Sequence, residues 1–192
     1  MNKYLLIIFC SWISACSLFE TNATIKNPKN KLAIITQKRD LSNKAMSIGP
    51  YFNTSKCEIE IECDCCASDL LFIDDKRFVY IAYCLESDSY LKGVYEANDT
   101  SITLHFDGKQ IIKEHNLDDP KDSLGLAKPE FILKDTINKA TTLTTSKYQC
   151  GKIAYYKIGR ENPEYGVFDK KGDVKAAIAA MKKEQIWQRL KW

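Results

Sequence analysis

The chain contains 192 residues, with 28 Lys and Arg against 25 Asp and Glu and a formal net charge of +3. This length suits one domain with a sizeable core, and the near balance of charge gives no basic field, which excludes nucleic acid as an expected partner. Tyr is the most frequent aromatic residue, with 10 copies. A Tyr-rich composition favours half-buried strands over a helical bundle.

The N-terminal residues have the features of an export signal. Lys3 gives a cationic start, residues 4 to 12 form an apolar run that is too short to span a bilayer, and the sequence Ile-Ser-Ala precedes Cys16. This arrangement resembles the lipobox of bacterial lipoproteins. The resemblance implies that residues 1–15 are removed and that Cys16 becomes the acylated N-terminus, which attaches the protein to a membrane through lipid.

The alternative for this segment is a secretory signal cut after Ala15, with Cys16 as an ordinary residue. Ser17, rather than Asp, follows Cys16, so the resemblance implies sorting to the bacterial outer membrane with the folded part in the periplasm. Residues 16–31 are polar without apolar periodicity and predict a flexible tether after the lipidated Cys. We expect residues 32–192 to form a single β-rich domain, in which 32–36 is either a strand or a short helix.

Alternation of apolar and polar residues predicts the first half of a β-meander. Residues 57–63 place two Cys and two Ile on one face and three Glu on the other. Residues 69–73 and 77–84 form a predicted hairpin around an Asp-Asp-Lys turn. A strand over 90–97 follows, and residues 101–106 alternate again, so these segments predict successive half-buried strands.

The most specific local signal is the dipeptide Asp107-Gly108. Asp tolerates and Gly favours the positive φ of a type I′ turn, so we predict a two-residue hairpin that joins 101–106 to a return strand over 109–115. A polar loop at 117–129 separates this meander from later strands. These are predicted at 131–135, 140–150, 152–158 and 164–168.

The C-terminal segment has helical periodicity. Asp173 can cap a helix over 173–191, whose apolar side contains Val174, Ile178, Met181, Ile186 and Leu190. The helix is also cationic, so it either packs on the sheet with solvated lysines or contacts a membrane surface or a partner. Together the elements predict a mainly β fold, an antiparallel meander that forms a small barrel or half-barrel with a C-terminal amphipathic helix, lipocalin-like in outline.

Six cysteines remain after the predicted leader and lipid anchor: Cys57, Cys63, Cys65, Cys66, Cys84 and Cys150. An even number in an exported protein favours disulfides. Cys57 and Cys63 lie about 20 Å apart on one predicted strand and cannot bond to each other. Each must reach another strand, where Cys84 and Cys150 are plausible partners, and the sequence does not choose among the pairings. The alternatives are metal binding by the thiolates of Cys63, Cys65 and Cys66, and redox exchange at Cys63 and Cys66.

The sequence contains no nucleophile elbow, zinc-protease motif or phosphate-binding glycine loop. His105 and His115 are predicted to be solvated, because neither has a Cys or a carboxylate at a fixed spacing. The alternating Glu58, Glu60 and Glu62 are interpreted as a solvated strand face. We therefore predict that the protein is not an enzyme and has no catalytic residue and no cofactor.

Residues 63–106 resemble the N-terminal domain of NlpE-type envelope-stress and copper-resistance lipoproteins. The resemblance rests on the Cys-x-x-C at Cys63 and Cys66 and on the segments DLLFI, FVYIAY, LKGVY and SITLHF, while Cys65 is additional to the pattern. It implies an envelope-sensor or metal-related role for a small β-meander.

These observations lead to three functional hypotheses. The first is a non-enzymatic binding or sensor module in the periplasm, anchored to the outer membrane, that binds a hydrophobic small molecule or a protein partner. The second is an inhibitor or immunity protein that blocks a lytic or toxic enzyme through exposed loops such as 117–129. The third is a lipoprotein that binds metal through Cys63, Cys65 and Cys66.

Overall fold

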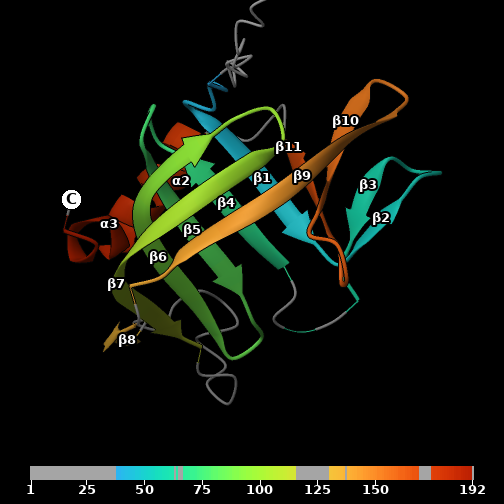
Figure 1. Cartoon of the computed structure of the whole chain (residues 1–192). Helices are drawn as coiled ribbons and strands as arrows, with labels where there is room; N and C mark the ends of the chain where they lie inside the picture. The colour runs from blue at the N-terminus through green and yellow to red at the C-terminus, as the bar shows by residue number, and fades with distance from the viewer. Residues whose placement is uncertain are drawn as a thin grey trace, which may run out of the picture. The chain divides into compact units, whose positions relative to one another are not determined.

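Most of the segments predicted as strands form strands in the computed structural model of the protein (Figure 1). The structure describes residues 38–62, 64, 67–115, 130–136, 138–168 and 174–191. The predicted leader, Cys16, the tether, the segment 32–36 and the loop 117–129 lie outside the described residues. All elements below belong to the compact unit formed by Ile35–Trp192.

Eight antiparallel strands close into a β-barrel, in the order β1-β4-β5-β6-β7-β9-β10-β11 and back to β1. The barrel strands are β1 (Lys44–Gly49), β4 (Ala67–Phe72), β5 (Arg77–Tyr83), β6 (Ser87–Ala97), β7 (Ser101–Glu114), β9 (Ala140–Cys150), β10 (Ile153–Ile158) and β11 (Glu164–Phe168). The mainly β fold and the predicted hairpin of β4 and β5 are confirmed. The outstanding choice between a barrel and a half-barrel is settled by the pairing of β1 with β11 and of β6 with β7.

Side chains alternate between the interior of the barrel and its outer face. In β4, Leu70 and Phe72 belong to the interior cluster, whereas Leu71 packs in a second cluster with the C-terminal helices. The same alternation places Phe78 inside and Val79 outside in β5. Because both faces of these strands are covered, the strands are apolar on both sides rather than on one.

Aromatic side chains fill the interior. The ring centroids of Phe72 and Tyr95 are 4.7 Å apart, and those of Phe78 and Phe106 are 5.2 Å apart, both in edge-to-face geometry. Phe72 and Phe78 have no exposed surface. An eight-strand barrel is just wide enough for its side chains to fill, so these rings form a packed core.

The C-terminal helical segment packs on the outer face of the barrel. This was one of the two arrangements predicted for it, the other being contact with a membrane surface or a partner. It is broken into α2 (Val174–Lys183) and α3 (Ile186–Arg189), and this differs from the single predicted helix over 173–191. Gln185 has a left-handed φ of 63° between them. In one continuous helix of about 3.6 residues per turn, Ile186 and Leu190 would lie about 120° to 160° around the axis from Val174. The break turns both side chains back onto the sheet, where they are buried.

The predicted hairpin at Asp107-Gly108 is wrong. β7 runs without interruption from Ser101 to Glu114, and β6 pairs with both of its halves. The register passes from Gly93 opposite Phe106 to Leu91 opposite Gln110, so three residues of β7 oppose Lys92 in a bulge. The positive φ of Gly108, 77°, serves this bulge instead of a turn.

The bulge marks the point where the other edge of β7 changes its partner. Residues Ser101–His105 pair with β9, whereas Lys109–Glu114 pair with β8 (Glu130–Asp135). The carbonyl of Gly108 accepts a hydrogen bond from Thr136 N–H at 2.7 Å, between the two pairings. Local turn chemistry suggested a reversal here, but long-range pairing on both edges keeps the strand continuous.

A short hairpin outside the barrel replaces the predicted strand 57–63. β2 (Tyr51–Asn53) pairs with β3 (Glu58–Glu60), and Cys57 lies in the intervening turn with a φ of 58°. Cys57 is therefore not on the core side of a strand, as the alternation suggested. The hairpin packs closely on the barrel at Gly49. A Cβ on this residue would lie only 2.4 Å from Ile59 Cγ2 of the hairpin.

Candidate functional site

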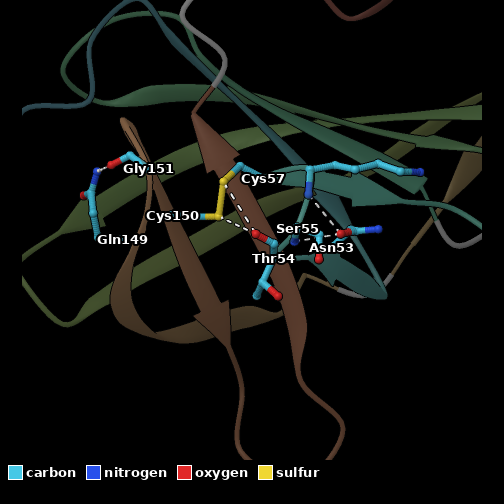
Figure 2. Close-up of a disulfide and its surroundings, with 8 residues drawn as sticks. Asn53, Thr54, Ser55, Cys57, Gln149, Cys150 and Gly151 are labelled. Atoms are coloured by element: carbon cyan, nitrogen blue, oxygen red, sulfur yellow. Dashed lines mark hydrogen bonds between the residues drawn. A yellow bond between two sulfur atoms is a disulfide. The ribbon is translucent and has the colours of Figure 1, made fainter.

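The β2–β3 hairpin and the β9–β10 hairpin are joined by a disulfide between Cys57 and Cys150 (Figure 2). The Cα atoms are 5.6 Å apart across a sequence separation of 93 residues. We call residues 51–60 and 145–158 together the cross-linked arm. Cys150 is one of the two plausible partners predicted for Cys57, and the structure selects it.

The turn that presents Cys57 is fixed by the side chain of Asn53. Its Oδ1 accepts hydrogen bonds from the N–H groups of Ser55, at 2.9 Å, and Lys56, at 3.0 Å. The carbonyl oxygen of Thr54 lies 3.0 Å from Cys150 Sγ (Figure 2). Since disulfide sulfurs carry no proton, this is a close sulfur–oxygen contact and not a hydrogen bond. The Asx-type turn thus holds Cys57 in its left-handed conformation.

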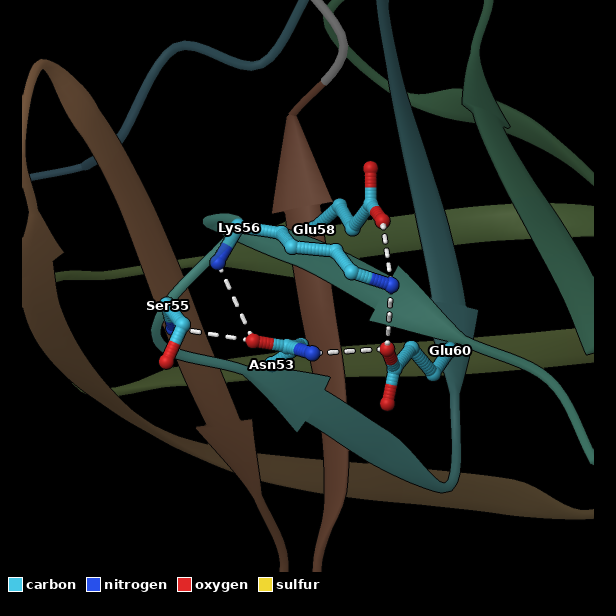
Figure 3. A network of polar contacts seen from close by, with 5 residues as sticks. All are labelled: Asn53, Ser55, Lys56, Glu58 and Glu60. Carbon is cyan, nitrogen blue, oxygen red and sulfur yellow. Dashed lines mark hydrogen bonds and ion pairs between the residues drawn. The ribbon is translucent and has the colours of Figure 1, made fainter.

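A polar network covers one side of the β2–β3 hairpin (Figure 3). Lys56 Nζ lies 3.2 Å from Glu60 Oε1 and 3.7 Å from Glu58 Oε1, and Asn53 Nδ2 donates to Glu60 Oε1 at 2.7 Å. The hydrogen bonds from Asn53 and then Lys56 lower the pKa of Glu60. Glu58 is exposed as the sequence predicted, but Glu60 is held within this network.

The opposite side of the hairpin stacks on the barrel's outer face through the aromatic cluster: Phe52, Tyr148, Tyr155 and Tyr165. The rings of Phe52 and Tyr155 are stacked with centroids 3.9 Å apart, and Tyr148 lies 5.4 Å from Tyr155. Tyr155 pairs directly with Tyr148 across β9 and β10, which puts both rings on one face. Tyr148 remains 46% exposed, so the cluster both braces the arm and reaches the surface.

The aromatic cluster was not predicted from the sequence. A signal for part of it exists, because Tyr148 and Tyr155 lie at equal distances from a tight turn at Gly151-Lys152. Phe52 and Tyr165 come from segments far from this turn in the chain, and no local pattern links them to it.

Three predicted disulfide cysteines are bonded in the structure, namely Cys57, Cys84 and Cys150. The partner of Cys84 is not among the described residues, since the other two bond to each other. Cys63, Cys65 and Cys66 lie outside the described residues. In the part of the chain that the structure describes, no group of three His, Cys, Asp or Glu side chains could hold a metal ion.

The two histidines have different surroundings. His105 is exposed on the outer face of β7, as predicted. His115 differs from the prediction, because its Nε2 lies 3.3 Å from Asp88 Oδ2, and Tyr90 donates a long hydrogen bond of 3.5 Å to the same oxygen. The strand pairing of β6 with β7 creates this group, which no sequence spacing could reveal. Burial and then the charge of Asp88 raise the pKa of Tyr90.

A second polar group lies on the outer face between β1, β4 and β5. Asp69 accepts hydrogen bonds from Ser47 Oγ at 2.7 Å and from Tyr83 O–H at 2.9 Å. Burial and then the Asp69 carboxylate raise the pKa of Tyr83. The raised pKa values keep Tyr83 and Tyr90 protonated as hydrogen-bond donors. A nucleophile or a general base requires the opposite, a lowered pKa.

No known protein family, curated protein or solved structure matches the chain. Within the described residues, none of the helices has the length and apolar character needed to cross a membrane.

Proposed function

We propose that the protein is a lipoprotein, anchored to the bacterial outer membrane through Cys16, that acts in the periplasm as a non-enzymatic binding or envelope-sensor module. Its binding surface is the cross-linked arm, which engages a protein partner. The observation that carries this proposal is the arm itself: the β2–β3 hairpin outside the barrel is joined by a disulfide and an aromatic stack to the β9–β10 hairpin of the barrel wall, and Tyr148 is exposed. Such rigid aromatic anchors at a surface are typical of protein interfaces.

The bonded cysteines support export. Disulfides persist in oxidising compartments and are rare in the reducing cytosol, and Cys57, Cys84 and Cys150 are all disulfide-bonded. The lipobox-like sequence before Cys16 supports the lipid anchor. The bonding of Cys84 also removes one of the soft ligands that the metal hypothesis could have used, which makes that hypothesis the weaker one.

Binding through the outside of the barrel fits the described residues better than a hydrophobic ligand within it. The interior rings pack against one another without exposed surface at Phe72 and Phe78. A hollow of about 590 Å³ lies at the ends of β6 and β7, and its lining includes Lys38, Asp75 and Glu96. Charged linings disfavour apolar ligands, because the charges would lose water without gaining a partner.

A site-specific crosslinking experiment tests the proposal. A photo-crosslinking amino acid replaces Tyr148 in one variant of the membrane-anchored protein and Leu133, which is 58% exposed on β8, in a matched control. We expect a discrete protein adduct from position 148 in intact envelopes and none from position 133. Replacement of Cys57 by Ser should weaken the adduct because the arm loses its brace. Equal labelling at both positions, or none at position 148, would refute the assignment.

The inhibitor or immunity hypothesis is one specific form of this proposal. Its loop, 117–129, lies outside the described residues, so the crosslinking partner decides it. A lytic or toxic enzyme as the adduct would favour this second candidate, and a structural envelope protein would favour the sensor role.

A further inference from the structure

The outer edge of β9 has backbone groups that point away from the barrel's own strands. Cys150 is paired with Ile153 across the two-residue loop Gly151-Lys152, and the closing pair of such a loop exchanges its hydrogen bonds across the hairpin. Hydrogen-bonding direction alternates along a strand, so Lys147 and Gln149 direct their N–H and C=O groups to the opposite edge. Thr145 follows the same alternation, since its N–H donates to the carbonyl of Thr100 at 2.8 Å.

This edge extends past the end of its neighbouring strand. The pairing of β9 with β7 ends at Thr144 opposite Ser101. Among the described residues, the next positions of β9 pair only with β10, while β2 and β3 form a separate two-stranded sheet. Residues 146–149 are exposed. The structure thus presents a short strand edge with two outward-facing residues, Lys147 and Gln149, beside the exposed ring of Tyr148.

Within the β9–β10 hairpin that carries this edge, the charge is of one sign. Residues 140–158 contain Lys147, Lys152 and Lys157 and no Asp or Glu. The acidic residues of the arm, Glu58 and Glu60, are on the other hairpin and interact with Lys56. An acidic segment would find complementary charge here. A second copy of the chain would instead bring Lys147 and Lys152 of the two copies together, and like charges on paired strands are destabilising.

We propose that the β9 edge of the cross-linked arm binds an extended acidic segment of a protein partner by adding it as a strand next to Lys147 and Gln149. Main-chain hydrogen bonds to these two residues provide the pairing, and the three lysines select for acidic side chains. Tyr148 contributes an aromatic surface beside the added strand. This inference rests on the proposed function and specifies the kind of partner that the arm takes.

Lysine on a short edge strand is also a common protection against unwanted pairing, so the experiment must separate a binding edge from a protected one. The probe is a fluorescently labelled peptide, Thr-Glu-Val-Glu-Val-Glu-Thr, titrated against the full-length protein in detergent. The same peptide with Gln in place of Glu and one with Lys in place of Glu serve as charge controls. We expect measurable binding of the acidic peptide, at least about tenfold weaker binding of the Gln peptide and none of the Lys peptide.

A matched pair of variants tests the strand pairing. Gln149→Pro removes the outward N–H, and Gln149→Ala removes the same side chain but keeps the N–H. Because Gln149 directs its N–H away from β10, neither variant should disturb the β9–β10 ladder, and an unchanged melting temperature checks this. We expect Gln149→Pro to weaken binding of the acidic peptide about tenfold and Gln149→Ala to change it less than about twofold.

Charge reversal completes the test. Lys147→Glu should abolish binding of the acidic peptide, whereas Lys134→Glu, on the exposed strand β8, should leave it unchanged. Equal binding of the acidic and Gln peptides, or full binding by Gln149→Pro, overturns this inference, as does a dimer of the protein that Gln149→Pro dissociates. A persistent crosslink from position 148 together with these failures would leave the proposed function standing and refute only the strand-addition mode.

Discussion

Lys92 of β6 and Asp107 of β7 form an ion pair, with Nζ and Oδ2 3.2 Å apart, at the place where the two strands lose register. Asp107 Oδ1 also accepts a hydrogen bond from Lys109 N–H at 3.1 Å. The Asp107 carboxylate therefore contacts both Lys92 on the neighbouring strand and the backbone of Lys109 within the bulge. This arrangement lets β7 bend while it remains one strand.

The first prediction concerns the bulge. Gly108→Val should lower the free energy of unfolding by about 1 to 3 kcal/mol, because a branched side chain at positive φ is strained. A Cβ at this position would also lie 2.0 Å from Asn138 Oδ1. Urea denaturation measures the effect. Adding Asn138→Ala should recover part of the loss by removing the contact while the backbone strain remains, and a Gly108→Val protein as stable as the wild type would contradict the bulge.

The second prediction concerns the disulfide of the arm. Replacing both Cys57 and Cys150 by Ser should lower stability by about 2 to 5 kcal/mol, as for a native bridge that closes a long loop. The near-ultraviolet circular dichroism of the tyrosines should weaken as well, because Phe52 would no longer be held in its stack with Tyr155.

Thiol titration of the unreduced wild-type protein should find few or no free thiols. Three or more titratable thiols with stoichiometric copper or zinc would instead assign Cys63, Cys65 and Cys66 to a metal site.

The third prediction concerns acid sensitivity at the β4–β5 turn. Burial raises the pKa of Asp74, but hydrogen bonds from the N–H groups of Arg77 and Lys76 and the Arg77 guanidinium outweigh it and lower the pKa below 3.8. A lowered carboxyl pKa contributes stability that is present above the unfolded value and is lost as the pH falls through the folded value. Asp74→Asn should therefore flatten the decline in melting temperature below about pH 4. Unaltered acid sensitivity of the variant would contradict this role.

The fourth prediction concerns the helix break. Gln185 adopts a left-handed φ of 63°, a conformation that costs glycine nothing. Gln185→Gly should therefore raise the free energy of unfolding by about 0.5 to 1 kcal/mol. Thermal denaturation should show a melting temperature higher by about 1 to 4 °C. A matched Gln188→Gly change inside α3 should destabilise the protein, and stabilisation by both changes would contradict the explanation.

The fifth prediction concerns the anchor. Cys16→Ser should release the protein from the outer membrane or stall its processing, because the acylated thiol is removed. Membrane fractionation and mass spectrometry of the N-terminus measure both effects. A Cys16→Ser protein that still fractionates with the outer membrane and is processed normally would show that the lipid anchor is wrong.

The sequence by itself was sufficient for most of the strands. Two short apolar runs around an Asp-Asp-Lys turn identified the hairpin of β4 and β5, and turn residues bounded β9, β10 and β11, because buried strands are apolar and tight turns need particular residues. It was sufficient for the fold class too, since short connections force neighbouring strands to pair in antiparallel order. The sequence offered Cys150 as one of two plausible partners of Cys57. Choosing between Cys84 and Cys150 required the positions of β2, β3 and β9 in the structure.

Only the tertiary structure decided the features that depend on distant segments. Asp107-Gly108 has the chemistry of a hairpin turn, yet pairing of β6 along both halves of β7 outweighed that local preference. The break at Gln185 follows from the position of the sheet that Ile186 must reach. The aromatic cluster joins Phe52, Tyr155 and Tyr165, which no sequence period relates. Local patterns record which face of an element is buried, whereas register, bulges and cross-links are fixed by which strand lies on each edge, and that is determined by the whole barrel at once.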